Sequence, residues 1–124
     1  MARILTTPVT SRAELIDAGS LLDVTRIARD HQIKLPCAIS AAAWRACGGR
    51  PDTFATARGD QLAGRILAAA RSQAAHSPKA ALARPALGFA VEDTRNGQHI
   101  VELELTVGPG DAGDPVATID VEGF

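Results

Sequence analysis

The chain has 124 residues and a formal net charge of −1, and 46% of its residues are hydrophobic against 22% charged. This length suits one core, and this composition excludes an intrinsically disordered chain. Aromatic residues make up only 3%, which argues against a single-strand nucleic-acid binder, because such proteins stack bases on exposed rings. We therefore expect a single domain over residues 1–124.

The first third of the chain predicts three short helices. Ser11 and Glu14 have the spacing of a capping box, which predicts a helix over about 12–18. Asp23 is suited to cap a second helix that ends near residue 31. Pro36 is suited to the first turn of a third helix, predicted over about 36–47, with Trp44 on its apolar face. We expect Trp44 to be a packing residue rather than a platform for a ligand.

The third helix determines what we expect of the two cysteines. Cys37 and Cys47 would lie about 15 Å apart along its axis, which excludes a disulfide between them. We expect both to be reduced, buried thiols. A fourth, long helix is predicted over about 57–75, where Leu62 and Ile66 begin an apolar stripe and Gly64 indicates close packing against another helix.

The last third of the chain changes from helical to strand periodicity. Apolar residues alternate with polar or small ones over 87–91, 100–107 and 116–121, and Asn96–Gly97 predicts a hairpin turn. The expected fold class is α+β, with about four N-terminal helices (residues 11–77) packed on one face of a C-terminal three-stranded antiparallel meander (residues 86–121).

Nothing in the sequence suggests a membrane protein. No stretch approaches the roughly 20 consecutive apolar residues that span a bilayer. Residues 1–10 also lack a charged-then-apolar signal pattern. We expect a cytoplasmic protein without a membrane partner.

Charge is distributed unevenly between the predicted helices and the predicted sheet. Residues 1–85 hold twelve Lys and Arg against six acids, and residues 86–124 hold Arg95 against eight acids. Two kinds of partner could exploit this difference. A basic protein could bind the sheet at Glu92, Glu102 and Glu104, or an anion, nucleic acid included, could bind the helices at Arg26, Arg29, Arg65 and Arg71. The alternative is that both are ordinary solvated surfaces.

We expect no catalytic residue, metal site or cofactor. The three histidines, His31, His76 and His99, lack the close spacing of a zinc site. Asp111 and Asp114 lie in a Gly-rich loop without the ligand spacing of a calcium loop, and turn chemistry explains them more simply. Cys37 and Ser40 are possible nucleophiles, but no nucleophile elbow, P-loop or dinucleotide fingerprint accompanies them.

Two stretches resemble a family of uncharacterised bacterial proteins found on plasmids, phages and other mobile elements. They are residues 14–44, ELIDAGSLLDVTRIARDHQIKLPCAISAAAW, and residues 108–119, GPGDAGDPVATI. In that family an acidic-Gly-x-Leu-x-Asp-Val-Thr segment precedes a Pro-x-Ala-x-Thr/Ser helix that carries a Trp. The matching positions here are Asp17, Gly19, Leu22, Asp23, Val24, Thr25, Pro36, Ala38, Ser40 and Trp44. The chain departs from the family in its Ala-rich, aromatic-poor body.

The resemblance implies a biological context but no reaction, because the family has no established activity. Small proteins of mobile elements often bind and block a host protein, including complexes that defend the host against foreign DNA. The leading hypothesis is a non-catalytic accessory protein that binds a host protein or complex, such as an anti-CRISPR or anti-restriction inhibitor. The alternatives are a nucleic-acid-binding or regulatory domain that uses the basic helices, and a small enzyme of unrecognised type. Each is compatible with a homo-oligomer.

Overall fold

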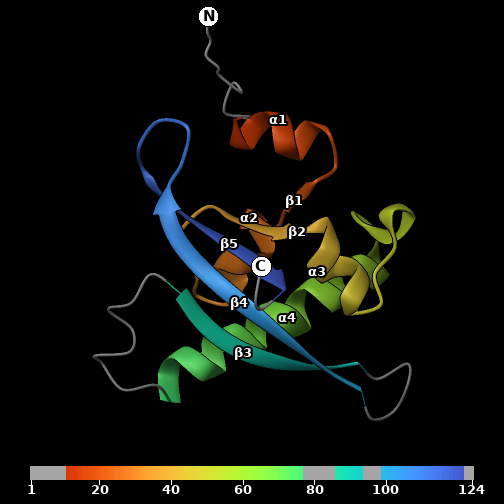
Figure 1. The fold of residues 1–124 in the computed structure, drawn as a ribbon. Helices are drawn as coiled ribbons and strands as arrows, with labels where there is room; N and C mark the ends of the chain where they lie inside the picture. The colour runs from red at the N-terminus through yellow and green to blue at the C-terminus, as the bar shows by residue number, and fades with distance from the viewer. Residues whose placement is uncertain (1–10, 77–85, 94–98, 122–124) are drawn as a thin grey trace, which may run out of the picture.

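A computed structural model describes residues 11–76, 86–93 and 99–121 (Figure 1). Among these residues, five strands form one sheet in the order β1-β2-β5-β4-β3. The elements in chain order are α1 (Arg12–Asp17), β1 (Leu21–Asp23), α2 (Thr25–Asp30), β2 (Cys37–Ser40), α3 (Ala41–Ala46), the 3₁₀ turn η1 (Pro51–Thr53), α4 (Ala57–His76), β3 (Ala86–Asp93), β4 (His99–Pro109) and β5 (Pro115–Val121).

The predicted three-stranded antiparallel meander is wrong, although the α+β class holds. Strands β3, β4 and β5 pair antiparallel as expected. The sheet continues beyond β5, however, because β2 pairs with β5 in parallel and β1 pairs antiparallel with β2. The sheet is therefore mixed and five-stranded, with β5 in its centre.

Strand β2 occupies part of the segment for which the sequence predicted the third helix. Its four residues are all buried, which is typical of an interior strand covered on both faces. The helix begins only after Ser40, whose hydroxyl accepts a hydrogen bond from the Ala43 N–H at 3.0 Å. Pro36 misled the prediction because proline suits an extended segment as well as a first helical turn. The Leu21–Asp23 segment, expected to lead into a helix, is likewise the strand β1.

Several local predictions are confirmed. The Ser11 hydroxyl accepts from the Glu14 N–H at 3.1 Å and the Glu14 carboxylate accepts from the Ser11 N–H, so the capping box opens α1. Gly19, at φ +81°, follows that helix. Helix α4 buries Leu62 and Ile66. A Cβ at Gly64 would lie 3.3 Å from His31 Nε2, which confirms the close packing of α4 against the α2 segment.

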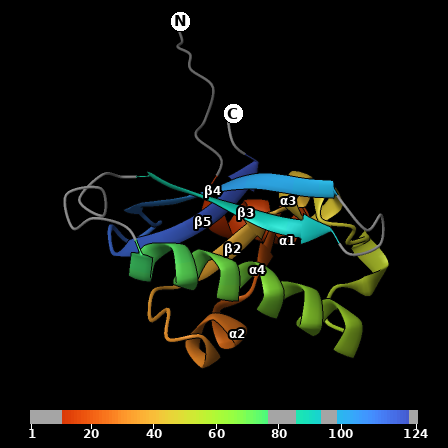
Figure 2. The same ribbon diagram turned by 90° about the horizontal axis from the view of Figure 1, so that it is seen from below.

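The helices do not all lie on one face of the sheet, so that part of the prediction is also wrong. Helices α2 and α4 lie on the same side of the sheet, and no described helix covers β3 and β4 on the other side (Figure 2). Helix α1 borders that second side, where the Arg12 guanidinium donates to Thr118 Oγ1 at 2.7 Å. Thr118 stands between the buried Ala117 and Ile119 of β5, so its side chain lies on the face opposite to α4.

Trp44 is a packing residue, as predicted. Its side chain is buried, its indole N–H donates to the Arg50 carbonyl at 3.1 Å, and its ring meets Phe54 edge-on at 5.7 Å. Cys37 and Cys47 are buried free thiols, also as predicted. The reasoning from a shared helix was wrong, however, because Cys37 lies in β2 and Cys47 follows α3.

The predicted turn at Asn96–Gly97 lies outside the described residues, although the β3–β4 register runs to Asp93 opposite His99. Within the described residues, no helix has the length and apolar character needed to cross a membrane.

Candidate functional site

The face of the sheet opposite α4 carries a row of carboxylates. On β4, Val101 and Leu103 are buried, and the residues between and beside them point to the other face. Glu102 there is exposed and Glu104 is half-buried, which agrees with the predicted outward orientation of both glutamates. Ile100 belongs to the same alternating set and is 62% exposed, so a large apolar side chain adjoins the carboxylates.

Asp120 on β5 adds a third carboxylate to this face, which we call the acidic face (Glu102, Glu104 and Asp120). Asp120 lies directly opposite Glu104 in the β4–β5 register. Its Oδ1 accepts hydrogen bonds from the Ser40 hydroxyl at 2.7 Å and from the Val121 N–H at 2.8 Å. Like charges placed opposite each other on neighbouring strands are unfavourable, and the Arg12 guanidinium beside Thr118 is the cation that adjoins them on this face.

The sequence analysis missed Asp120, although a signal for it existed. Alternation of Ala117, Ile119 and Val121 toward the core places Asp120 outward by the same rule that was applied to the two glutamates. Glu92, the third predicted acid, lies in β3 in register with Ile100. The side chain of Glu92 lies outside the described residues.

A groove of about 760 Å³ borders the acidic face. Glu104, Thr118 and Asp120 line one side of it, and the beginning of α1 and the β4–β5 loop line the other. The loop is attached to α1 by Asp111, whose carboxylate accepts from the backbone N–H groups of Arg12 and Ala13 at 2.8 and 3.1 Å. These two bonds lower the pKa of Asp111, and the nearby Arg12 charge lowers it further. Asp111 is thus occupied in fastening α1 rather than in turn formation alone.

The four arginines predicted to bind an anion do not form one surface. Arg26 on α2 pairs with Asp60 at 3.2 Å, and Arg71 on α4 donates to Gln32 Oε1 at 3.2 Å. Arg65 is six residues before Arg71 on the same helix, which separates the two by about 120° around its axis. Arg65 instead lines a different hollow, together with Arg50 and Arg58. Arg29 is exposed on α2.

The two possible nucleophiles are placed where catalysis is disfavoured. Burial raises the pKa of the Cys37 thiol to about 11, despite an opposing effect of the Arg12 charge. Its reactive thiolate is therefore scarce at neutral pH. The Ser40 hydroxyl caps α3 and donates to Asp120, so both of its hydrogen-bonding roles are structural.

The residues that could hold a metal ion are dispersed. Among the described residues, no group of three or more His, Cys, Asp or Glu has the arrangement of a metal site. His31 packs beside Gly64, and the side chains of His76 and His99 lie outside the described residues. Asp114 contributes its backbone carbonyl to a turn, where it accepts from the Gly110 N–H at 2.7 Å.

Comparison with known proteins returns no relative. No family model matches the chain, and no curated protein and no solved structure matches it. The functional argument therefore depends on the geometry of this chain's own residues.

Proposed function

We propose that the protein is a small non-catalytic binding protein that engages a basic protein partner through the acidic face of its sheet. The observation that carries this proposal is the juxtaposition of Glu102, Glu104 and Asp120 on a sheet face that no described helix covers over β3 and β4. The host protein as partner and the anti-defence inhibitor as role are what the resemblance of residues 14–44 and 108–119 to mobile-element proteins implies, and the geometry of the acidic face does not depend on them.

The geometry supports a protein partner for two reasons. A row of carboxylates raises the local concentration of a basic partner and selects against acidic ones. Ile100, 62% exposed beside Glu102, offers the apolar contact that protein interfaces bury at their centre. An acidic surface with an apolar anchor suits Lys and Arg side chains, whose aliphatic stems cover apolar atoms while their charged ends reach carboxylates.

Nucleic-acid binding through Arg26, Arg29, Arg65 and Arg71 is the weaker alternative. Arg65 and Arg71 lie on different flanks of α4, where they line two separate hollows. A nucleic-acid backbone binds along a continuous basic surface. A gel-shift assay across a salt series therefore separates the hypotheses, because phosphate contacts impose a steep dependence on salt.

The decisive experiment measures association rates with a purified partner. Nuclease-treated bacterial lysate is passed over the immobilised protein, retained proteins are identified, and each is purified and titrated at several salt concentrations. The double variant E102K/E104K should lower the association rate constant at least about tenfold at low salt and flatten its salt dependence. The dissociation rate constant should change much less.

A matched control keeps the net charge change equal. The double variant D17K/D30K also replaces two exposed acids, at the ends of α1 and α2, which are not among the residues that line the groove beside the acidic face. It should bind as the unmodified protein does. Equal association rates for both double variants would refute the acidic face as the binding surface, as would binding that disappears only when the four arginines are neutralised.

A further inference from the structure

A second hollow, with the opposite charge, lies between the α3–α4 connection and the first turns of α4. Its volume is about 490 Å³, within the range of small-molecule sites. Its charged lining residues are Arg50, Arg58 and Arg65, and none of the carboxylates in the described part of the chain lines it. We call it the arginine pocket. None of its lining residues belongs to the sheet, so it is separate from the acidic face.

The three guanidinium groups come from two directions. Arg58 and Arg65 are seven residues apart on α4, nearly two full turns, so they lie on the same flank of the helix. Arg50 comes from the connection that forms the other wall. Guanidinium groups from both walls can therefore reach one bound group, and their planar donor pairs match the oxygens of a phosphate.

Arg50 forms an ion pair with Asp52 at 3.2 Å, but this pair does not block the pocket. The two side chains are 70% and 69% exposed, and ion pairs so exposed to water contribute little to stability. The hydrogen bond to Asp52 makes the largest contribution to the raised pKa of Arg50. An incoming dianion can replace one carboxylate oxygen at modest cost, since a phosphate offers more oxygens and more charge.

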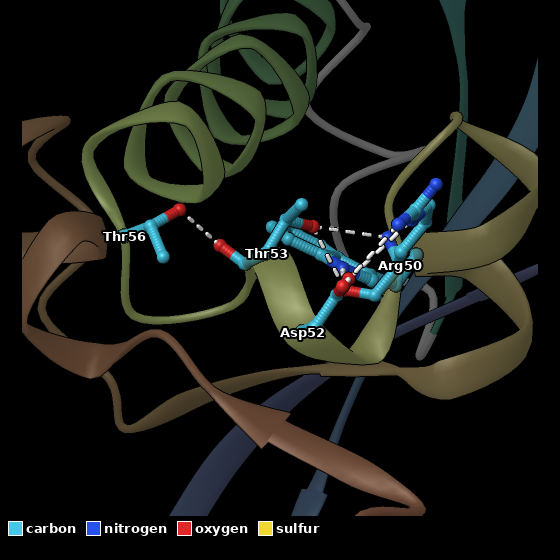
Figure 3. Close-up of polar contacts among 5 residues, drawn as sticks. Arg50, Asp52, Thr53 and Thr56 are labelled. Carbon is cyan, nitrogen blue, oxygen red and sulfur yellow. Dashed lines mark hydrogen bonds and ion pairs between the residues drawn. The ribbon is translucent and has the colours of Figure 1, made fainter.

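Hydrogen bonds among Arg50, Thr53 and Thr56 hold the wall that carries Arg50 (Figure 3). The Arg50 N–H donates to Thr53 Oγ1 at 3.0 Å, and that hydroxyl donates to the Arg50 carbonyl at 2.8 Å. The Thr56 hydroxyl donates to the Thr53 carbonyl, and the Gly59 N–H donates to the Thr56 hydroxyl. These bonds tie the connection to the start of α4. The backbone of the site is therefore positioned without a ligand, and the entropy lost on binding is that of the exposed arginine side chains.

Two glycines allow the walls to approach each other and the core. A Cβ at Gly59 would collide with the Thr53 carbonyl oxygen, so only glycine permits this distance between η1 and α4. A Cβ at Gly49 would collide with the indole of Trp44. These two close contacts fix the position of the connection against α4 and against Trp44.

From this geometry we propose that the arginine pocket binds the phosphate groups of a small phosphorylated ligand, such as a nucleoside diphosphate. Three guanidinium groups suit a polyphosphate better than a single carboxylate, because each can pair with its own set of oxygens. Leu62 and Cys47 add an apolar wall that suits the uncharged part of such a ligand. This proposal is independent of the partner assigned to the acidic face.

The test is a titration of the ¹⁵N-labelled protein with ADP and with inorganic pyrophosphate, with adenosine as the uncharged probe. ADP and pyrophosphate should produce saturable amide shifts at Gly48, Gly49 and Gly59, and adenosine alone should not. The double variant R58Q/R65Q should weaken both affinities at least about tenfold. The E102K/E104K variant should bind both ligands as the unmodified protein does, which keeps this test separate from that of the acidic face.

The control variant is R26Q/R29Q, which removes two exposed arginines from α2. It should retain both affinities within about twofold. If R26Q/R29Q and R58Q/R65Q weaken binding equally, the anion responds to overall charge and the pocket is not a site. If a single-stranded oligonucleotide displaces ADP and binds more tightly, the ligand is a nucleic acid and the small-ligand proposal is wrong. Circular dichroism of each variant checks that the fold is retained.

Discussion

The two halves of the sheet are built in different ways. Strands β3, β4 and β5 follow one another in the chain and pair with their neighbours in sequence. Strands β1 and β2 come from the N-terminal part, and β2 enters the sheet beside β5, with Cys37 opposite Ala117. The C-terminal half could be predicted from alternation within short windows. The N-terminal half depends on a contact between segments 80 residues apart, which no local pattern encodes.

The largest effects should come from one core residue in each half. Ile39 in β2 and Leu103 in β4 are both 0% exposed, and replacing either by Ala should lower the free energy of unfolding by about 2–5 kcal/mol. Urea denaturation followed by circular dichroism measures both. I100A, at an exposed position of β4, is the control and should change it by less than about 0.5 kcal/mol. A loss below about 1 kcal/mol for I39A alone would show that β1 and β2 are only peripherally attached.

A smaller effect should come from the hydroxyl that joins the two halves. Ser40 caps α3 and donates to Asp120 of β5, so S40A removes a helix cap and a contact between the halves. The expected loss is about 1–2 kcal/mol. S11A, which removes only the cap of the outlying α1, should lose about 0.5–1 kcal/mol. Equal losses in thermal unfolding would indicate that the Ser40–Asp120 bond contributes nothing.

The attachment of α1 to the C-terminal half should depend on pH. The pKa of Asp111 is lowered in the folded protein, so its contribution is complete above the unfolded value of about 3.9 and is lost as the pH falls through the folded pKa. NMR titration of the carboxyl carbon should give a midpoint below that unfolded value. D111N should speed amide hydrogen exchange at Arg12 and Ala13 near neutral pH and leave the β3–β4 amides unchanged. Unchanged exchange at Arg12 would contradict the fastening role.

The smallest effect should come from a residue that belongs to neither half. Ala55, in the connection before α4, has φ +67°, which costs an L-residue about 1–2 kcal/mol. A55G should stabilise the protein by up to about 1 kcal/mol, because part of the gain is offset by the greater freedom of Gly in the unfolded chain. The control is A42G within α3, where φ is helical and Gly should destabilise. A lower melting temperature for A55G would contradict the assignment of strain.

The sequence was sufficient to predict structure at positions where a residue's neighbours along the chain determine its environment. Alternation placed Leu103 inside and Glu102 outside, and the capping box at Ser11 located α1. The sequence was insufficient at Pro36–Ser40, where a Pro followed by a short, mainly apolar run is compatible with both a helix and an interior strand. The parallel pairing with β5 decided between them.

The candidate sites also divide into one that local sequence predicts and one that only tertiary contacts create. The acidic face follows from strand alternation, so two of its three carboxylates were predicted and the third, Asp120, was within reach of the same rule. The arginines predicted to bind an anion are spread over separate hollows, because Arg65 and Arg71 were grouped by charge without regard to their angle around α4. The arginine pocket could not be predicted at all. Its two walls are the α3–α4 connection and α4, and their close contact at Gly59 is defined only in the folded chain.

The parallel pairing of β2 with β5 also determines the order in which the molecule can be completed during synthesis. Cys37 leaves the ribosome 80 residues before its neighbour Ala117. At typical elongation rates of 5–20 residues per second, that gap lasts about 4–16 s. Throughout this interval one edge of β2, with its apolar residues on both faces, has no strand beside it. The nascent chain therefore exposes an unpaired, apolar strand edge, to which a chaperone can bind until β5 has been synthesised.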